Sequence, residues 1–132
     1  MHQIVTGARG ERTLLVTAGN CIDFMGEAGP RVLSTPRMIG FMERTCRDLA
    51  LPMLAPGHDT VGTHVNVFHV VAAGIGAVVI FRAEVTGFSE RRIEFRVEAH
   101  AGELKIGEGT HQRAIVDVAK FAARASAKPA NG

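Results

Sequence analysis

The sequence predicts an α+β domain in which one long helix is wrapped by an antiparallel sheet of about five strands. Apolar residues recur at helical spacing in one segment of the first half, between Thr35 and Pro52. From Thr60 onward the apolar period changes to two, which is typical of half-buried strands. The links between the last strands are too short to contain a helix, so neighbouring strands are expected to run antiparallel. One helix on one sheet is a two-layer design, and the sheet edge left open favours a dimer.

The helix is expected to begin at Thr35. Thr35 occupies the capping position and Pro36 the first helical position, where the missing N–H of proline costs nothing. Pro52 ends the helix. Gly40 costs about 1 kcal/mol relative to alanine inside a helix, so we expect another backbone to approach closely there. The apolar residues at helical spacing are Met38, Ile39, Met42, Cys46 and Leu49.

Strands are expected on both sides of the helix. A short β-type run covers residues 13–16, and four longer candidates cover residues 61–71, 77–87, 92–101 and 104–116. The run at 92–101 alternates apolar and polar residues most regularly, which predicts one buried and one solvent-exposed face. Short links at 88–91 and 102–103 predict that the longer strands follow one another as a meander.

Length and composition indicate a single domain, residues 1–132, whose last residues, 122–132, form a frayed tail. The chain is 46% hydrophobic and 21% charged, which is typical of a globule with a real core. A formal charge of +2 is too balanced for a protein that coats nucleic acid. No apolar run approaches the roughly 20 residues of a membrane span. The first residues lack the pattern of a secretion signal and the cysteines make no disulfide framework, so we expect a cytoplasmic protein without nucleic-acid or membrane partners.

Three side chains supply the groups needed for acyl transfer or hydrolysis: Thr35, Glu43 and His69. A hydroxyl at a helix N-terminus lies where free N–H groups stabilise developing negative charge. An imidazole, with an ordinary pKa of about 6.5, suits proton transfer near neutrality. Each residue also has a structural interpretation: Thr35 as the helix cap, Glu43 as an ion-pair partner of Arg47, and His69 as a core or interface residue. Spacing alone leaves these alternatives open.

Other polar residues show weaker patterns. The run Gly107-Glu108-Gly109 lies inside a strand, so it indicates a bulge or a close backbone approach rather than a dinucleotide-binding loop. Arg113 either contacts a phosphate or carboxylate or forms a surface salt bridge. Cys46 is either buried and inert or close to a cleft. No metal site is expected, because the remaining histidines lack metal-ligand spacing: His2, His58, His64, His100 and His111.

Three stretches together resemble the fluoroacetyl-CoA thioesterase family, a branch of the hot-dog fold. Residues 35–46 (TPRMIGFMERTC) resemble its helix, residues 62–69 (GTHVNVFH) its second-strand motif, and residues 107–113 (GEGTHQR) its last-strand motif. Each motif is weak alone, but the intervals between the motifs resemble those of the family over residues 30–121. The resemblance implies a hot-dog fold, in which the sheet wraps the helix.

The resemblance also implies an activity and a set of site residues. Thr35, Glu43 and His69 take the catalytic positions, and Gly62 and Arg113 take positions that contact substrate. The implied reaction is hydrolysis of an acyl-CoA thioester to free acid and CoA, near the interface of a homodimer or within a tetramer. Coenzyme A enters as part of the substrate, and no other cofactor is implied.

One departure bears on specificity. The loop at residues 26–33 (GEAGPRVL) contains no aromatic residue, whereas the fluoroacetyl-specific enzyme has an aromatic cover in this region. We therefore expect a thioesterase with a specificity different from fluoroacetyl-CoA. The alternatives are a non-catalytic module that binds acyl-CoA or another metabolite, and a hot-dog hydratase, which ranks lowest because its Asp-x-Asn-Pro-x-His motif is absent.

Overall fold

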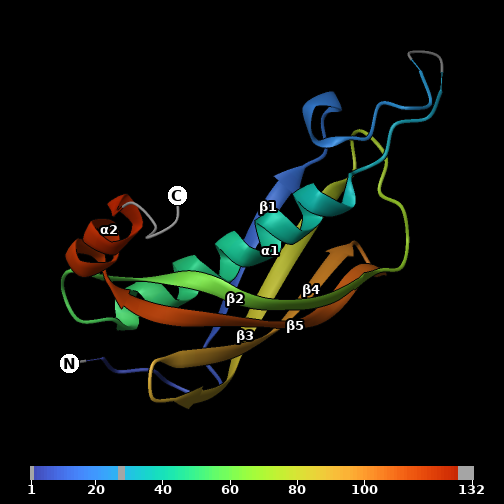
Figure 1. Ribbon diagram of the computed structural model, residues 1–132. Coiled ribbons are helices and arrows are strands. Elements are labelled where there is room, and N and C mark those ends of the chain that lie inside the picture. The colour runs from blue at the N-terminus through green and yellow to red at the C-terminus, as the bar shows by residue number, and fades with distance from the viewer. Residues whose placement is uncertain (1, 27–28, 128–132) are drawn as a thin grey trace.

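The computed structural model describes residues 2–26 and 29–127 (Figure 1). In these residues the chain forms five strands, two α-helices and two short 3₁₀ helices, in agreement with the predicted fold class. In chain order the elements are β1 (Arg9–Leu15), η1 (Ala18–Asn20), α1 (Thr35–Ala50), η2 (Leu51–Met53), β2 (His58–His69), β3 (Val78–Ser89), β4 (Arg92–Ala101), β5 (Leu104–Asp117) and α2 (Val118–Ser126).

The strands form one antiparallel sheet in the order β1-β3-β4-β5-β2. β3, β4 and β5 follow one another as the predicted meander, but the prediction is wrong for β2, which pairs with β5 rather than β3. Residues 70–77 connect β2 to β3 and reach up to roughly 26 Å when extended. Because β2 and β3 are separated by only about 14 Å across two intervening strands, this segment can cross the end of the sheet. β2 consequently lies at an edge.

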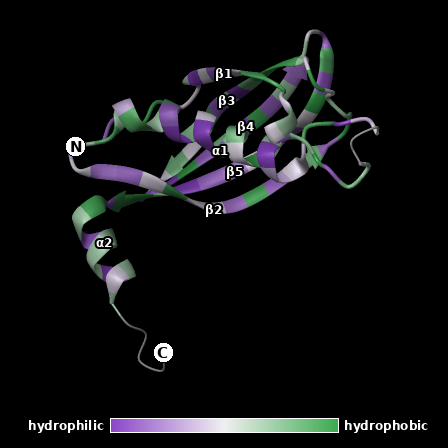
Figure 2. Ribbon diagram, turned by 90° about the horizontal axis from the view of Figure 1, so that it is seen from above, coloured by the Kyte–Doolittle hydropathy of each residue, from purple (hydrophilic) through white to green (hydrophobic). Residues whose placement is uncertain are grey.

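Helix α1 packs on one face of the sheet, against β1, β2, β3 and β4. Figure 2 shows α1 lying across the strands on one face of the sheet. The predicted alternation in β4 is confirmed, since its apolar residues up to Ala99 are buried and Arg92, Glu94 and Arg96 are exposed. The helix and β4 bury Met38, Met42, Thr45, Cys46, Ala50, Ile93, Phe95, Val97 and Ala99 in the shared core.

Glycines show where backbones approach closely. Gly107 and Gly109 of β5 confirm the predicted close backbone approach: a Cβ on Gly107 would lie 2.9 Å from the Phe68 carbonyl oxygen of β2, and one on Gly109 would collide with the Asn66 carbonyl oxygen of β2. The prediction for Gly40 is wrong. A Cβ on Gly40 would meet no atom of the described residues within 4 Å, because this glycine lies on the exposed side of α1.

The end of the chain also differs from the prediction. Residues 118–126 form α2, so the tail expected from Ala122 is helical up to Ser126, while residues 128–132 lie outside the described residues. Asp117 explains the helix start, because its side chain accepts a hydrogen bond of 3.0 Å from the Lys120 amide. No residue of α2 is buried, and Figure 2 shows the helix projecting beyond β2. Within the described part of the chain, no helix combines the length and apolar content needed to cross a membrane.

A pair of glycine substitutions tests this packing. Gly40→Ala is expected to raise the free energy of unfolding by up to about 1 kcal/mol, since alanine favours the helix and meets no neighbour. Gly109→Ala is expected to lower it by about 1–3 kcal/mol, because its methyl group would force β5 away from β2. Urea unfolding of both variants gives the comparison. A destabilised Gly40→Ala would mean that another surface covers this side of α1.

Candidate active site

The N-terminus of α1 is capped by Ser34. The Ser34 hydroxyl accepts a hydrogen bond from the Arg37 amide, and Thr35 and Pro36 are the first two helical residues. The prediction that Thr35 is the cap is therefore wrong by one residue. Since Ser34 supplies the cap, the Thr35 hydroxyl is left free for another partner.

The connection between β2 and β3 brings the end of β2 to this helix terminus. The Leu33 amide donates to the Ala73 carbonyl at 2.7 Å, and Val32 forms a β-bridge with Gly74. At the start of the same connection, the Val70 amide donates to the Ile106 carbonyl of β5 at 2.8 Å. These contacts anchor the segment before α1 and the end of β2 to one place.

Thr35 and His69 form a hydrogen-bonded pair at that place. Thr35 Oγ1 lies 2.8 Å from His69 Nδ1. The other ring nitrogen of His69, Nε2, is buried and has no hydrogen-bond partner among the described residues. Burial lowers the pKa of His69 below its ordinary value, so the ring is neutral at pH 7 and its Nδ1 can accept the hydroxyl proton of Thr35.

A second polar cluster lies further along α1. Glu43 approaches Gly62 of β2 and His111 of β5, with Glu43 Oε1 3.9 Å from His111 Nε2. A Cβ on Gly62 would lie 2.7 Å from Glu43 Oε1 and 3.6 Å from Arg113 Nη1. The missing side chain of Gly62 therefore makes room for the carboxylate and the guanidinium. The alternative that Glu43 pairs with Arg47 is wrong, because Arg47 binds Asp59 instead.

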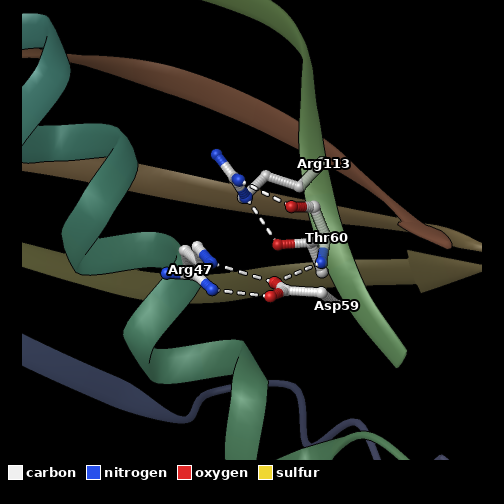
Figure 3. A network of polar contacts seen from close by, with 4 residues as sticks. All are labelled: Arg47, Asp59, Thr60 and Arg113. Carbon is white, nitrogen blue, oxygen red and sulfur yellow. Dashed lines mark hydrogen bonds and ion pairs between the residues drawn. The ribbon is translucent and has the colours of Figure 1, made fainter. Parts of the chain in front are cut away.

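Arg113 is buried, with only 6% of its surface exposed, so the surface salt-bridge alternative is also wrong. Its Nε donates to Thr60 Oγ1 at 2.7 Å and its Nη2 to the Thr60 carbonyl at 2.9 Å. Figure 3 shows Thr60 linking Arg113 to an ion pair in which Arg47 Nη2 lies 2.6 Å from Asp59 Oδ2. No carboxylate of the described residues lies within 4.0 Å of Arg113, so its charge faces Glu43 without direct contact.

Two residues of this cluster escaped the sequence analysis, Thr60 and His111. His111 Nε2 lies 3.1 Å from Arg113 Nη1, and its Nδ1 lies 2.8 Å from the His64 carbonyl oxygen. One signal was available: His111 stands two residues before Arg113, so both side chains share one face of a strand. Thr60 left no such signal, because its contact depends on the register of β2 against β5.

The structure does not bring all the predicted residues together within one chain. It joins Thr35 to His69, and it gathers Glu43, Gly62 and Arg113. Along α1, eight residues separate Thr35 from Glu43, which is a rise of roughly 12 Å. Along β2, seven residues separate Gly62 from His69, which is roughly 23 Å. One chain therefore holds the predicted site residues in two separate groups, which we name half-sites: the Thr35–His69 pair and the Glu43–Gly62–Arg113 cluster.

Other features of the described residues give little chemistry. Cys46 is buried, and burial raises the pKa of its thiol to about 12, which agrees with the alternative of a buried, inert cysteine. Residues 2–26 and 29–127 contain no group of three histidine, cysteine or acidic side chains arranged to hold a metal ion. Surface hollows of about 490 and 640 Å³ are lined by residues of β1, β3, β4, the β3–β4 turn and Ala114, outside both half-sites.

Comparison with known proteins identifies relatives that share both sequence and fold. The family described as fluoroacetyl-CoA-specific thioesterase, FlK, matches residues 16–119. The fluoroacetyl-CoA thioesterase of Streptantibioticus cattleyicolor is 39% identical over 103 residues, which are 78% of this chain and 74% of that protein. The solved structure of the fluoroacetyl-CoA thioesterase FlK has a TM-score of 0.86 at 32% identity, covering 96% of this chain and 98% of that chain.

More distant structures agree on the fold. A thioesterase-superfamily protein of Thermus thermophilus is 28% identical, with a TM-score of 0.85 over 94% of this chain and 92% of that chain. A hot-dog-like protein of Thermanaerovibrio acidaminovorans shares the fold at 18% identity and a TM-score of 0.83, over 91% of this chain and 89% of that chain. The predicted hot-dog fold and family are thereby confirmed. The chain belongs to the fluoroacetyl-CoA-specific thioesterase family, a family of hot-dog enzymes that hydrolyse thioester bonds.

Proposed function

We propose that this enzyme hydrolyses an acyl-CoA thioester whose acyl group is not fluoroacetyl. The observation that best supports the proposed hydrolysis is the 2.8 Å contact between Thr35 Oγ1 and His69 Nδ1 at the N-terminus of a capped helix. It combines a hydroxyl, a neutral imidazole and a positive helix end, which together favour attack on a carbonyl.

In the proposed reaction, Thr35 is the nucleophile or holds the attacking water. His69 Nδ1 takes the proton of the attacking oxygen as that oxygen bonds to the thioester carbon. The carbonyl oxygen gains negative charge near the helix N-terminus, and the C–S bond then breaks. His69 returns its proton to the CoA sulfur. If Thr35 is the nucleophile, a water molecule releases the acid from its ester in a second, equivalent step.

Glu43 completes this catalytic set in the proposal. When Thr35 donates to Nδ1, the proton of neutral His69 is on Nε2, the ring nitrogen without a partner among the described residues. A carboxylate that accepts this Nε2–H would hold the ring in place and stabilise it when it becomes charged; because Nε2 is buried within its own chain, such a carboxylate reaches it only when the His69 ring turns on assembly. Glu43 is too far along α1 in the same chain, as judged by the roughly 12 Å rise from Thr35.

A homodimer supplies the missing carboxylate. β2 is an edge strand, and residues 62–66 of it are exposed, so a second copy can pair with it. Antiparallel pairing about a two-fold axis between Val65 and Asn66 sets Gly62 opposite His69 of the partner subunit. Each Thr35–His69 pair then faces the other subunit's Glu43–Gly62–Arg113 cluster. In this arrangement Gly62 admits the thioester close to the backbone, and Arg113 contacts the acyl part of the substrate.

The proposed difference in specificity rests on the loop before α1. The fluoroacetyl-CoA thioesterase of S. cattleyicolor is named for fluoroacetyl-CoA. In this chain residues 26–33 contain no aromatic residue, and the nearest one, Phe24, is 79% exposed. Residues 26–33 therefore supply no aromatic side chain to cover the small fluorinated acyl group, which favours a different acyl group.

Release of free thiol from a panel of acyl-CoA esters, from acetyl to long-chain and aryl-acetyl and including fluoroacetyl, tests the function. The wild type is expected to release thiol from at least one ester and to favour it over fluoroacetyl-CoA. His69→Ala is expected to lower kcat at least about a hundredfold, because the proton acceptor is lost. A preference for fluoroacetyl-CoA would contradict the proposed specificity.

The same panel separates the alternative functions. Esters that raise the melting temperature without releasing thiol would indicate a binding module and overturn the proposed hydrolysis. Conversion of an enoyl ester to its hydroxyacyl ester would indicate a hydratase.

Neighbouring hydroxyls at the start of α1 provide a matched pair of variants. Thr35→Val keeps the branched side chain but removes the hydroxyl, so we expect a loss of kcat of about a hundredfold or more with the fold retained. Ser34→Ala removes the cap, so we expect about 1 kcal/mol less stability, and a much smaller loss of kcat than in Thr35→Val because the Thr35 hydroxyl is retained. Steady-state kinetics and urea unfolding measure both. Equal kcat in Thr35→Val and the wild type would refute the catalytic role of Thr35.

A further inference from the structure

The contacts of His111 define its tautomer. His111 Nδ1 lies 2.8 Å from the His64 carbonyl oxygen, which can only accept, so Nδ1 carries a proton. His111 Nε2 lies 3.1 Å from Arg113 Nη1, which can only donate, so Nε2 carries none. The ring is therefore neutral and accepts a hydrogen bond from the Arg113 guanidinium.

The surroundings of His111 keep it neutral. The side chain is 2% exposed and stacks on Phe95 of β4, with ring centroids 6.2 Å apart. The charged and titratable groups that face it are Arg113 of β5, Glu43 of α1 and His64 of β2. Burial above all, and then the positive charge of Arg113, lower the pKa of His111 below its ordinary value.

His111 contacts the guanidinium nitrogen of Arg113 that lies beside Gly62. Thr60 binds Arg113 through Nε and Nη2, whereas His111 binds Nη1. Nη1 is the atom of Arg113 that lies 3.6 Å from the vacant Cβ position of Gly62. His111 and Thr60 thus hold the guanidinium plane at three nitrogens, and His111 determines the direction of Nη1.

Resting on the proposed function, in which Arg113 contacts the substrate, we propose that neutral His111 is a positioning residue that aims Arg113 Nη1 at the acyl part of the substrate. Protonation of His111 ends this contact, because two N–H donors of like charge would then face each other. The protonated ring instead attracts Glu43, whose Oε1 is 3.9 Å from Nε2. Acidification therefore has two effects: Arg113 Nη1 is no longer held in its direction by His111, and the Glu43 carboxylate is drawn to the protonated ring.

Two His111 variants separate positioning from packing. His111→Phe keeps a ring against Phe95 but cannot accept from Arg113, so we expect KM to rise about tenfold with a much smaller change in kcat. His111→Gln carries a carbonyl oxygen that can replace Nε2 as acceptor, so we expect KM near the wild type.

A double-mutant cycle shows whether His111 acts through Arg113. In an Arg113→Met background, His111→Phe is expected to change KM no further, because the shared contact is already gone. A KM increase that persists in this background would overturn the proposal. So would a His111→Phe enzyme with unchanged KM.

NMR spectra of the wild type without substrate test the role of His111 with no need for turnover or for a variant that folds. In ¹⁵N NMR spectra of the wild type, His111 is expected to carry its proton on Nδ1. The guanidinium N–H signals of Arg113 are expected to shift with the titration of His111, at a pH below 6.5. A proton on Nε2, or Arg113 signals that ignore this titration, would overturn the proposal. If no ester is hydrolysed, the proposed function fails while these spectra still decide the role of His111.

Discussion

The start of helix α1 is the constraint on which the rest of the site depends. The Ser34 hydroxyl takes the capping bond from the Arg37 amide, and the backbone bond from Leu33 to Ala73 ties this terminus to the β2–β3 connection. Together they set the free hydroxyl of Thr35 2.8 Å from His69. A cap one residue later would use the Thr35 hydroxyl for the helix itself. Because Ser34 caps the helix, the Thr35 hydroxyl can contact His69 while the helix end stays satisfied.

The second half-site depends on a buried cation held by neutral groups. Arg113 binds Thr60 and His111 rather than a carboxylate. The Thr60 amide in turn donates to Asp59, which forms an ion pair with Arg47. The hydrogen bond and charge of Arg47 hold the pKa of Asp59 below its ordinary value, so the Asp59 carboxylate stays ionised near neutrality. No carboxylate of the described residues contacts Arg113 directly, so its charge is not neutralised there, and in the proposed reaction it is available to the acyl group. Gly62 leaves the room this requires.

Sequence reasoning found the elements whose signal is local. The alternation in β4 and the helical spacing of Met38, Met42 and Cys46 reflect one-sided burial, which any single segment records. The position of β2 at the sheet edge and the Thr60–Arg113 contact depend instead on register between distant strands, which no single segment records. Ser34 was missed because serine and threonine cap equally well on local grounds, and the two stand side by side. Sequence reasoning singled out Thr35, Glu43, His69 and Arg113, and the resemblance to a family added Gly62 and assigned the roles, but neither indicated the division into two half-sites.

The central claim is that each active site combines the Thr35–His69 pair of one chain with Glu43 of another, and complementation tests it most directly. Thr35→Val and Glu43→Gln proteins, each inactive alone, are mixed and allowed to exchange subunits. The account predicts recovery to about a quarter of wild-type activity, because half of the dimers are mixed and each of those contains one intact site. Mixed dimers that form, as shown by mass spectrometry, yet stay inactive would contradict the account and place the whole catalytic set within one chain.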